Sequence, residues 1–207
     1  MIRHRVIRIL LVFTFASLAP VLRADYVSGN QLVQVLRGGG YTLLMRHASS
    51  PHRPPDAAHA NPDNKNAERQ LDESGRATAR ELGEAIRALK IPIGEVLSSP
   101  TYRALETVHY AELGKATTFA QLGDSGHSMQ SDPTGTRGAW LLHKLIEQPS
   151  AGTNTVIVTH LPNIVEALGR EWSNLKDGET LVVRTDGNKP VVVAKIAAEQ
   201  WSTLDTR

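Results

Sequence analysis

The sequence has 207 residues, of which 41% are hydrophobic and 21% are charged. A chain of this length and composition forms one globular domain with a sizeable core, and it is neither disordered nor a bundle of membrane helices. It contains no cysteine, which excludes disulfides, thiolate zinc sites and cysteine nucleophiles.

The first residues have the pattern of an export signal. Three arginines within the first eight residues precede an uncharged apolar run over 9–19, which is shorter than the roughly 20 apolar residues of a membrane span. This pattern is typical of a secretory signal peptide. We expect cleavage after Ala24, although Leu22 stands where a small residue is usual, and an uncleaved anchor is the alternative. The expected organisation is a signal peptide over 1–24 and one domain over 25–207, periplasmic or secreted.

The charge balance depends on this segment. Four of the 23 basic residues lie in 1–24, which leaves 19 basic against 21 acidic residues in the expected mature chain. The pI near 9.0 therefore does not indicate a nucleic-acid-binding protein, which needs a basic stripe on the folded domain. We expect neither nucleic-acid binding nor stable membrane association after cleavage. The sequence does not indicate the oligomeric state.

The first half of the domain predicts alternating helices and strands. A short helix is expected over 31–37, ended by three consecutive glycines, and a buried strand over 41–45. Residues 51–66 are rich in proline and asparagine, which indicates a long loop. Apolar residues at helical spacing follow Gly75 as far as Leu89.

The alternation continues to the end of the chain. Expected elements are strands over 95–98, 117–120 and 155–159, helices over 101–113, 138–147 and 163–168, a polar loop over 123–133, and late strands over 181–184 and 191–196. Such alternation predicts an α/β fold, a three-layer sandwich with a mostly parallel central sheet flanked by helices. The two late strands are separated by an Asp-Gly-Asn turn and are expected to add an antiparallel edge.

Polar residues gather where three of the expected strands end. These are Arg46 and His47, the segment 98–103 with Arg103, and His160. Because ligands bind at the carboxyl ends of strands in such sheets, we expect these side chains to share one pocket. Two guanidinium groups suit phosphate oxygens, and a neutral imidazole can attack phosphorus and carry the phosphoryl group. This chemistry needs no metal and no cofactor.

Four segments in order match the motifs of a known family. Leu43–Ala48 resembles the opening Arg-His-Gly motif of the histidine phosphatase superfamily, which has the phosphoglycerate-mutase-like fold. Ser98–Thr107 resembles its Ser-x-x-x-Arg-x-x-x-Thr motif, and Val156–His160 its strand ending in histidine. Gln70–Ala77 is similar to the Leu-Thr-x-x-Gly helix start between them. The likeness runs from about residue 41 to residue 184 and is closest to exported bacterial members of branch 1.

The resemblance implies a role for each matched residue. It makes His47 the nucleophile, Arg46 and Arg103 the phosphate-binding residues, and His160 the second histidine of the pocket. Ala48 stands where the family usually has glycine, and alanine is small enough for close approach of a phosphate group.

The proton donor is the main departure from the family. Many members carry an acidic residue after the second motif that protonates the leaving group, whereas phosphohistidine phosphatases work without a strong donor. Asp124 is the nearest candidate here, although its Gly-Asp-Ser-Gly context is also ordinary turn chemistry. Asp132 and Glu179 are alternatives.

The two polar loops, over 49–69 and 121–135, are expected to wall the pocket and set specificity. We expect Arg69 and Ser49 to contact the substrate; Arg53 and Arg69 could equally be solvated. The loops also hold three histidines, which we interpret as surface residues rather than metal ligands: His52, His59 and His127.

These observations predict a metal-independent phosphomonoester phosphatase of the histidine acid phosphatase type, acting through a phosphohistidine on His47. The expected substrate is a small phosphoester, such as a phosphosugar, a lipopolysaccharide core phosphate or a scavenged ester. The alternative is a non-catalytic phosphate- or phosphosugar-binding protein of the same fold. A mutase ranks lower, because the chain lacks the longer insertions expected of mutases.

Overall fold

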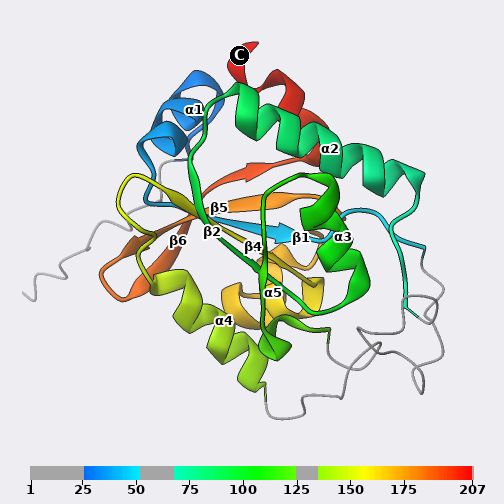
Figure 1. Cartoon of the computed structure of the whole chain (residues 1–207). Helices are drawn as coiled ribbons and strands as arrows, with labels where there is room; N and C mark the ends of the chain where they lie inside the picture. Colours follow the sequence, from blue (N-terminus) through cyan, green and yellow to red (C-terminus); the bar gives the residue numbers. More distant parts are fainter. Residues whose placement is uncertain (1–25, 52–67, 125–134, 207) are drawn as a thin grey trace, which may run out of the picture.

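The computed structural model describes residues 26–51, 68–124 and 135–206 (Figure 1). Its helices and strands alternate as the sequence predicts. In chain order they are α1 (Gly29–Gly38), β1 (Thr42–Arg46), α2 (Glu73–Ala88), β2 (Ile93–Ser98), α3 (Tyr102–Tyr110), β3 (Thr117–Thr118), η1 (Ala120–Leu122), α4 (Thr136–Ile146), β4 (Asn154–Thr159), α5 (Leu161–Leu168), η2 (Arg170–Trp172), β5 (Thr180–Asp186), β6 (Lys189–Ile196) and η3 (Ala198–Thr206).

The six strands form one sheet in the order β3-β2-β4-β1-β5-β6. Strands β3, β2, β4 and β1 run parallel to one another. Strand β5 is antiparallel to both β1 and β6, which confirms the expected antiparallel hairpin. Strands β1 and β4 are adjacent, and β2 is the other neighbour of β4, so the three strands that precede the polar residues lie side by side.

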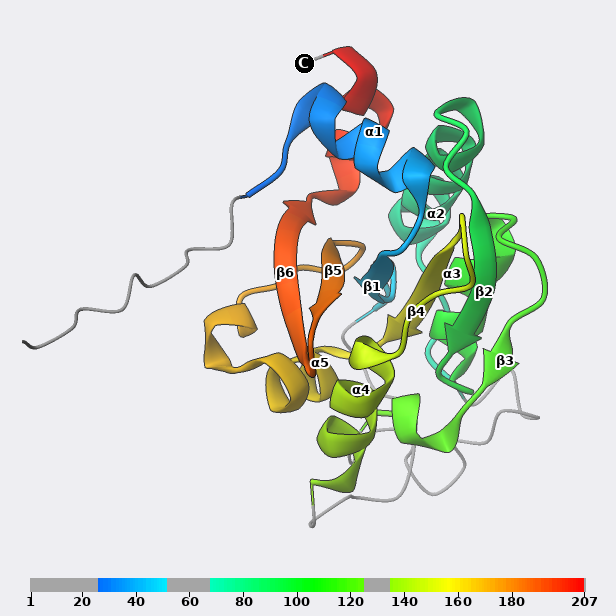
Figure 2. The same cartoon turned by 90° about the vertical axis from the view of Figure 1, so that its left-hand side faces the viewer.

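The sheet is buried on both faces, because its strands send alternate apolar side chains to opposite sides. Leu43 and Met45 of β1 join the core under α1, α2 and α3, whereas Leu44 joins the core under α4 and α5. Figure 1 and Figure 2 show these helices as two layers on either side of the sheet. The structure thus has the expected three-layer architecture. It adds the C-terminal turns of η3, which the sequence analysis did not predict and which bury Trp201 in the first core.

The start of α2 holds the segment after β1 in place. Asp72 caps the helix, since its side chain accepts a hydrogen bond from the Gly75 amide at 2.7 Å. Its other oxygen accepts a hydrogen bond from the Ser49 hydroxyl at 2.7 Å. Gly75 lies so close to the Ser49 backbone that no side chain would fit there. The carboxyl end of β1 is therefore anchored to α2 just beyond His47.

Some expectations concern parts of the chain outside the described residues. These are the signal peptide over 1–24, most of the loop over 51–66, and Arg53, Asp132 and the loop histidines. No helix in the described ranges is long and apolar enough to cross a membrane.

Candidate active site

The structure brings the polar strand ends together at one edge of the sheet. His47 follows β1 and His160 follows β4, and their ring centroids lie 5.1 Å apart. Both rings are buried, with 4% and 2% of their surface exposed. Arg103, in the first turn of α3, is 1% exposed and contacts both rings. Three predicted residues from three separate motifs thus meet in one buried cluster with Asp124.

The tautomer of His47 follows from its two partners. Nδ1 lies 2.8 Å from the Ala48 carbonyl oxygen, which can only accept, so Nδ1 carries the proton. Nε2 accepts a hydrogen bond from Arg103 Nε at 3.2 Å. The lone pair of His47 is therefore on Nε2 and faces the guanidinium group.

Arg103 connects every other member of the cluster. Its Nη2 donates to His160 Nδ1 at 3.1 Å and forms a short ion pair with the carboxylate of Asp124. Asp124 is 3% exposed. The guanidinium therefore bridges the two imidazoles while an acidic side chain balances its charge.

His160 has the opposite proton arrangement to His47. Arginine donates only, so Nδ1 of His160 accepts and the neutral ring carries its proton on Nε2. Nε2 lies 2.9 Å from the Ser99 hydroxyl and 3.2 Å from the Thr101 hydroxyl. Both hydroxyl groups are fully buried. Ser99 is the serine of the Ser-x-x-x-Arg-x-x-x-Thr motif, whereas the sequence analysis did not single out Thr101.

The surroundings keep both histidines neutral. Burial is the largest cause that lowers the pKa of His47 well below its usual value, and the charges of Arg103, Arg46 and Arg69 act in the same direction. Burial also lowers the pKa of His160, followed by Arg103. At neutral pH each ring therefore offers one lone pair.

The segment that carries Asp124 is held by one residue at the end of β4, Thr159, and one in α5, Asn163. The Thr159 hydroxyl donates to the Leu122 carbonyl at 2.8 Å, and Asn163 Nδ2 donates to the Gly123 carbonyl at 2.8 Å. Both side chains are fully buried. These bonds bring Asp124 beside Arg103, although the two are 21 positions apart in the chain.

Arg46 lies at the same strand end but binds a different loop. Its Nη1 donates to the Leu175 carbonyl at 2.6 Å, and its Nη2 lies 2.6 Å from Asp177 Oδ1. Its Nε is buried without a hydrogen-bond partner in the described ranges, as is Nε of Arg69. Buried N–H donors of this kind favour an anionic ligand.

The remaining predicted residues have structural partners. Arg69 donates to the carbonyl and the hydroxyl of Ser50 at 3.3 and 2.6 Å, within electrostatic range of Arg103 and Arg46. The Ser49 hydroxyl donates a hydrogen bond to Asp72. Glu179, the alternative proton donor, instead accepts from the Lys176 amide and pairs with Lys195 at 3.0 Å.

Helix α3, which carries Arg103, has an unusual N-terminus. Thr101 is the N-cap residue but makes no side-chain cap bond, because its hydroxyl lies against His160. Glu68 supplies a replacement, since its Oε2 accepts the Tyr102 amide at 2.6 Å. Burial raises the pKa of Glu68, and the bond from Tyr102 offsets part of this effect. Sequence spacing could not have indicated a partner 34 positions away.

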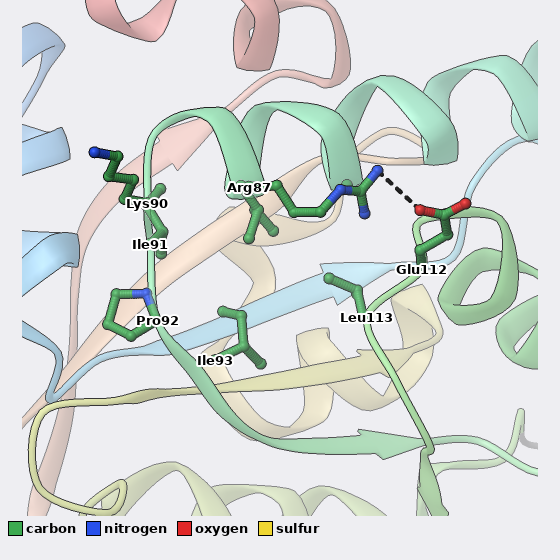
Figure 3. Close-up of a pocket in the computed structure, with 9 residues that line it drawn as sticks. Arg87, Lys90, Ile91, Pro92, Ile93, Glu112 and Leu113 are labelled. Atoms are coloured by element: carbon green, nitrogen blue, oxygen red, sulfur yellow. Dashed lines mark ion pairs between the residues drawn. The ribbon is translucent and has the colours of Figure 1, made fainter.

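No group of three or more metal-ligating side chains is found within the described ranges. A solvent-open hollow of about 420 Å³ lies elsewhere, between the end of α2 and the start of β2 (Figure 3). It is lined by Arg87 and Glu112, which pair at 3.1 Å, and by isoleucines such as Ile86 and Ile93. No histidine lines this hollow, and it lies at the amino end of β2, away from the cluster of His47, Arg103 and His160.

Comparison with known proteins agrees with this geometry. The family model described as histidine phosphatase superfamily (branch 1) matches residues 42–124. No curated protein matches the chain in sequence.

Solved structures share the fold at low sequence identity. The protein histidine phosphatase SixA complexed with tungstate has a TM-score of 0.55 at 17% identity, over 77% of this chain and 98% of that one. A mutant phosphoserine phosphatase from Entamoeba histolytica in complex with phosphoserine has a TM-score of 0.54 at 14% identity, with the same coverage of both chains. Bacillus stearothermophilus YhfR has 0.53 at 14%, over 76% of this chain and 98% of that one. The chain is thus similar to the histidine phosphatase superfamily (branch 1) over residues 42–124, which carry His47, Arg103 and Asp124, and it shares the fold of these solved structures.

Proposed function

We propose that this protein is a metal-independent phosphomonoesterase that forms a phosphohistidine on Nε2 of His47. The match of residues 42–124 to the model of the histidine phosphatase superfamily (branch 1) supports phosphatase activity. The observation that carries the proposal is the state of His47: its Nδ1 proton is held by the Ala48 carbonyl at 2.8 Å, and its Nε2 lone pair faces Arg103. A neutral imidazole with one oriented lone pair is a competent nucleophile.

The arginines supply the electrostatic part of the reaction. In this proposal the phosphoryl oxygens take over the N–H groups that Arg103 now directs at the two histidines, and Nε of Arg46 and Nε of Arg69 add buried donors. Donors arranged before the reaction stabilise the charge of the transition state.

The reaction then has two balanced steps. In the first, Nε2 of His47 bonds to phosphorus, the P–O ester bond breaks, and the leaving oxygen takes a proton from Asp124. Before this step, phosphoryl oxygens that bind Arg103 displace Asp124 from its ion pair, and the displaced carboxylate takes this proton from solvent. In the second, water attacks phosphorus, the P–N bond breaks, and inorganic phosphate leaves while Asp124 recovers its proton.

The test is turnover of an aryl phosphate in the presence of EDTA by the wild type and by His47→Ala. We expect EDTA-resistant turnover that the substitution lowers by about 10⁴-fold or more, because the covalent route is lost. His143→Ala is the matched control, since His143 is 73% exposed and pairs with Glu147 on the surface of α4. Equal turnover in wild type and His47→Ala would refute the mechanism.

The binding-protein alternative gives a different result. A chain that binds phosphate and is stabilised by it against heat, yet turns over no aryl phosphate or phosphosugar, would be a non-catalytic member of the fold. The observation that favours this outcome is the ion pair with Arg103, which holds Asp124 as a carboxylate.

We also propose that the protein is exported and acts on small phosphoesters such as phosphosugars or lipopolysaccharide core phosphates. The proposal is supported by the basic and apolar N-terminal segment. Cell fractionation tests it, with N-terminal sequencing of the mature protein: a chain retained in the cytoplasm with Met1 intact would contradict export.

A further inference from the structure

The hydroxyl groups of Ser99 and Thr101 form a small buried network around His160. Ser99 Oγ lies 2.9 Å from His160 Nε2 and 3.0 Å from Thr101 Oγ1, and it accepts the Thr101 amide at 3.2 Å. Thr101 Oγ1 also lies 3.2 Å from Nε2. Both residues are 0% exposed, so no solvent competes for these bonds.

In the structure the protons of this network run in one direction. His160 Nδ1 accepts from Arg103, so Nε2–H donates to Ser99, and Ser99 donates to Thr101. This arrangement suits a site in which Arg103 lies between the two rings. It does not suit a site that holds a phosphoryl group. The lone pair on Nδ1 would then face a phosphoryl oxygen, and two acceptors cannot form a hydrogen bond.

A hydroxyl group can resolve this conflict, because it donates or accepts with equal ease by rotation. If Thr101 donates to Ser99 and Ser99 donates to Nε2, the proton of the neutral ring moves to Nδ1. The change needs no movement of heavy atoms within the network.

We propose that Ser99 and Thr101 are positioning residues that let His160 exchange tautomers, so that Nδ1 accepts from Arg103 in the empty site and donates to the phosphoryl group in the loaded one. One proton leaves Nε2 and one arrives at Nδ1, with solvent as source and sink, so the charge of the site does not change. The low pKa of His160 is consistent with a ring that stays neutral in both states. The inference rests on the proposed function, since a phosphoryl group must bind beside His160.

The direct test is ¹⁵N NMR of the histidine rings of the full chain, with His160 assigned by its loss in His160→Gln. We use inorganic tungstate as the oxyanion probe. We expect Nε2–H in the free protein and Nδ1–H with Nε2 accepting in the tungstate complex. Two results would overturn the proposal: an Nε2–H tautomer in both states, or a doubly protonated ring in the complex.

Substitutions separate this role from packing. Ser99→Ala removes the nearer hydroxyl and Thr101→Val removes the other while keeping the shape of the side chain. We expect each to weaken tungstate binding and to lower kcat/KM about 5- to 100-fold, as befits one buried hydrogen bond left unmade. Thr101→Ser restores the hydroxyl and is expected to recover most of the loss.

Ser98→Ala is the matched control, because Ser98 is equally buried but donates to the Ser99 carbonyl and contacts neither histidine. It should retain the tautomer change. The same change in the double variant Ser99→Ala/Thr101→Val, at wild-type tungstate affinity, would contradict the proposal. A wild type that shows the tautomer change without turnover would refute the phosphatase mechanism and leave this inference intact.

Discussion

The two histidines of the site look alike and differ in what holds them. Both follow adjacent parallel strands, both are buried, and both contact Arg103. His47 Nδ1–H donates a hydrogen bond to a backbone carbonyl, which can only accept, so the tautomer of His47 is fixed. His160 Nε2–H donates to hydroxyl groups, which can either accept or donate a hydrogen bond, so the direction of these bonds can reverse. The comparison teaches that a nucleophile requires one permanent lone pair, whereas a group that meets both an arginine and a phosphoryl oxygen requires an adaptable partner.

Arg103 contacts both histidines, and its replacement should have the largest effect after the loss of His47 itself. Arg103→Lys keeps the charge but loses the planar fork that reaches both rings and Asp124. We expect kcat/KM to fall about 10²- to 10³-fold, measured by steady-state turnover of an aryl phosphate. Arg87→Lys, at the surface hollow of Figure 3, is the control. A loss of less than threefold would show that the fork does not matter.

Asp124→Asn tests whether Asp124 donates a proton to the leaving oxygen when His47 attacks phosphorus. We expect kcat/KM for alkyl phosphates to fall about 10- to 100-fold further than for aryl phosphates, because only the poorer leaving group needs the proton. The measurement is the ratio of kcat/KM for the two substrates. An equal loss on both would mean that Asp124 only orients Arg103.

The buried histidines should make stability depend on pH in a predictable direction. Their pKa values are lowered in the folded protein, so the unfolded chain binds protons first as the pH falls below about 6.5. Stability is therefore complete above that pH and decreases below it. Thermal unfolding at pH 7.5 and 5.5 should show a lower Tm at the acidic pH. The double variant His47→Gln/His160→Gln should show a smaller difference, and an unchanged difference would assign the effect to other groups.

The smallest expected effect concerns Glu68, which accepts the Tyr102 amide at the N-terminus of α3. Thr101, the N-cap residue, instead contacts His160 with its hydroxyl group. Glu68→Ala removes the acceptor of the Tyr102 amide and should cost about 0.5–2 kcal/mol of unfolding free energy. We also expect kcat to fall, because the N-terminus of α3, which carries Arg103, is then held less firmly. Glu68→Gln keeps an acceptor and should recover most of both. Glu106→Ala is the control, since this buried carboxylate accepts the Leu71 amide at 2.7 Å. A selective loss of kcat in Glu106→Ala instead would contradict this role of Glu68.

Much of the fold could be predicted because its signals are local. The run Thr155–Thr159 is β-branched throughout and forms the fully buried β4, and the helical spacing after Gly75 corresponds to α2. The late hairpin follows from its turn residues between β5 and β6. Short η3 at the C-terminus has no such periodicity, and burial of Trp201 in the core under α1, α2 and α3 decides its position.

The sequence by itself determined which strand ends carry His47, Arg103 and His160, because hydrophobic periodicity places strands and their ends, and parallel strands bring those ends to one edge. Only the tertiary structure decided which atoms meet there. Ser99 and His160 are 61 positions apart, Glu68 and Tyr102 are 34 apart, and Arg46 and Leu175 are 129 apart. Hydrogen bonds of this kind depend on distances of a few tenths of an ångström between distant segments, and no local spacing encodes them.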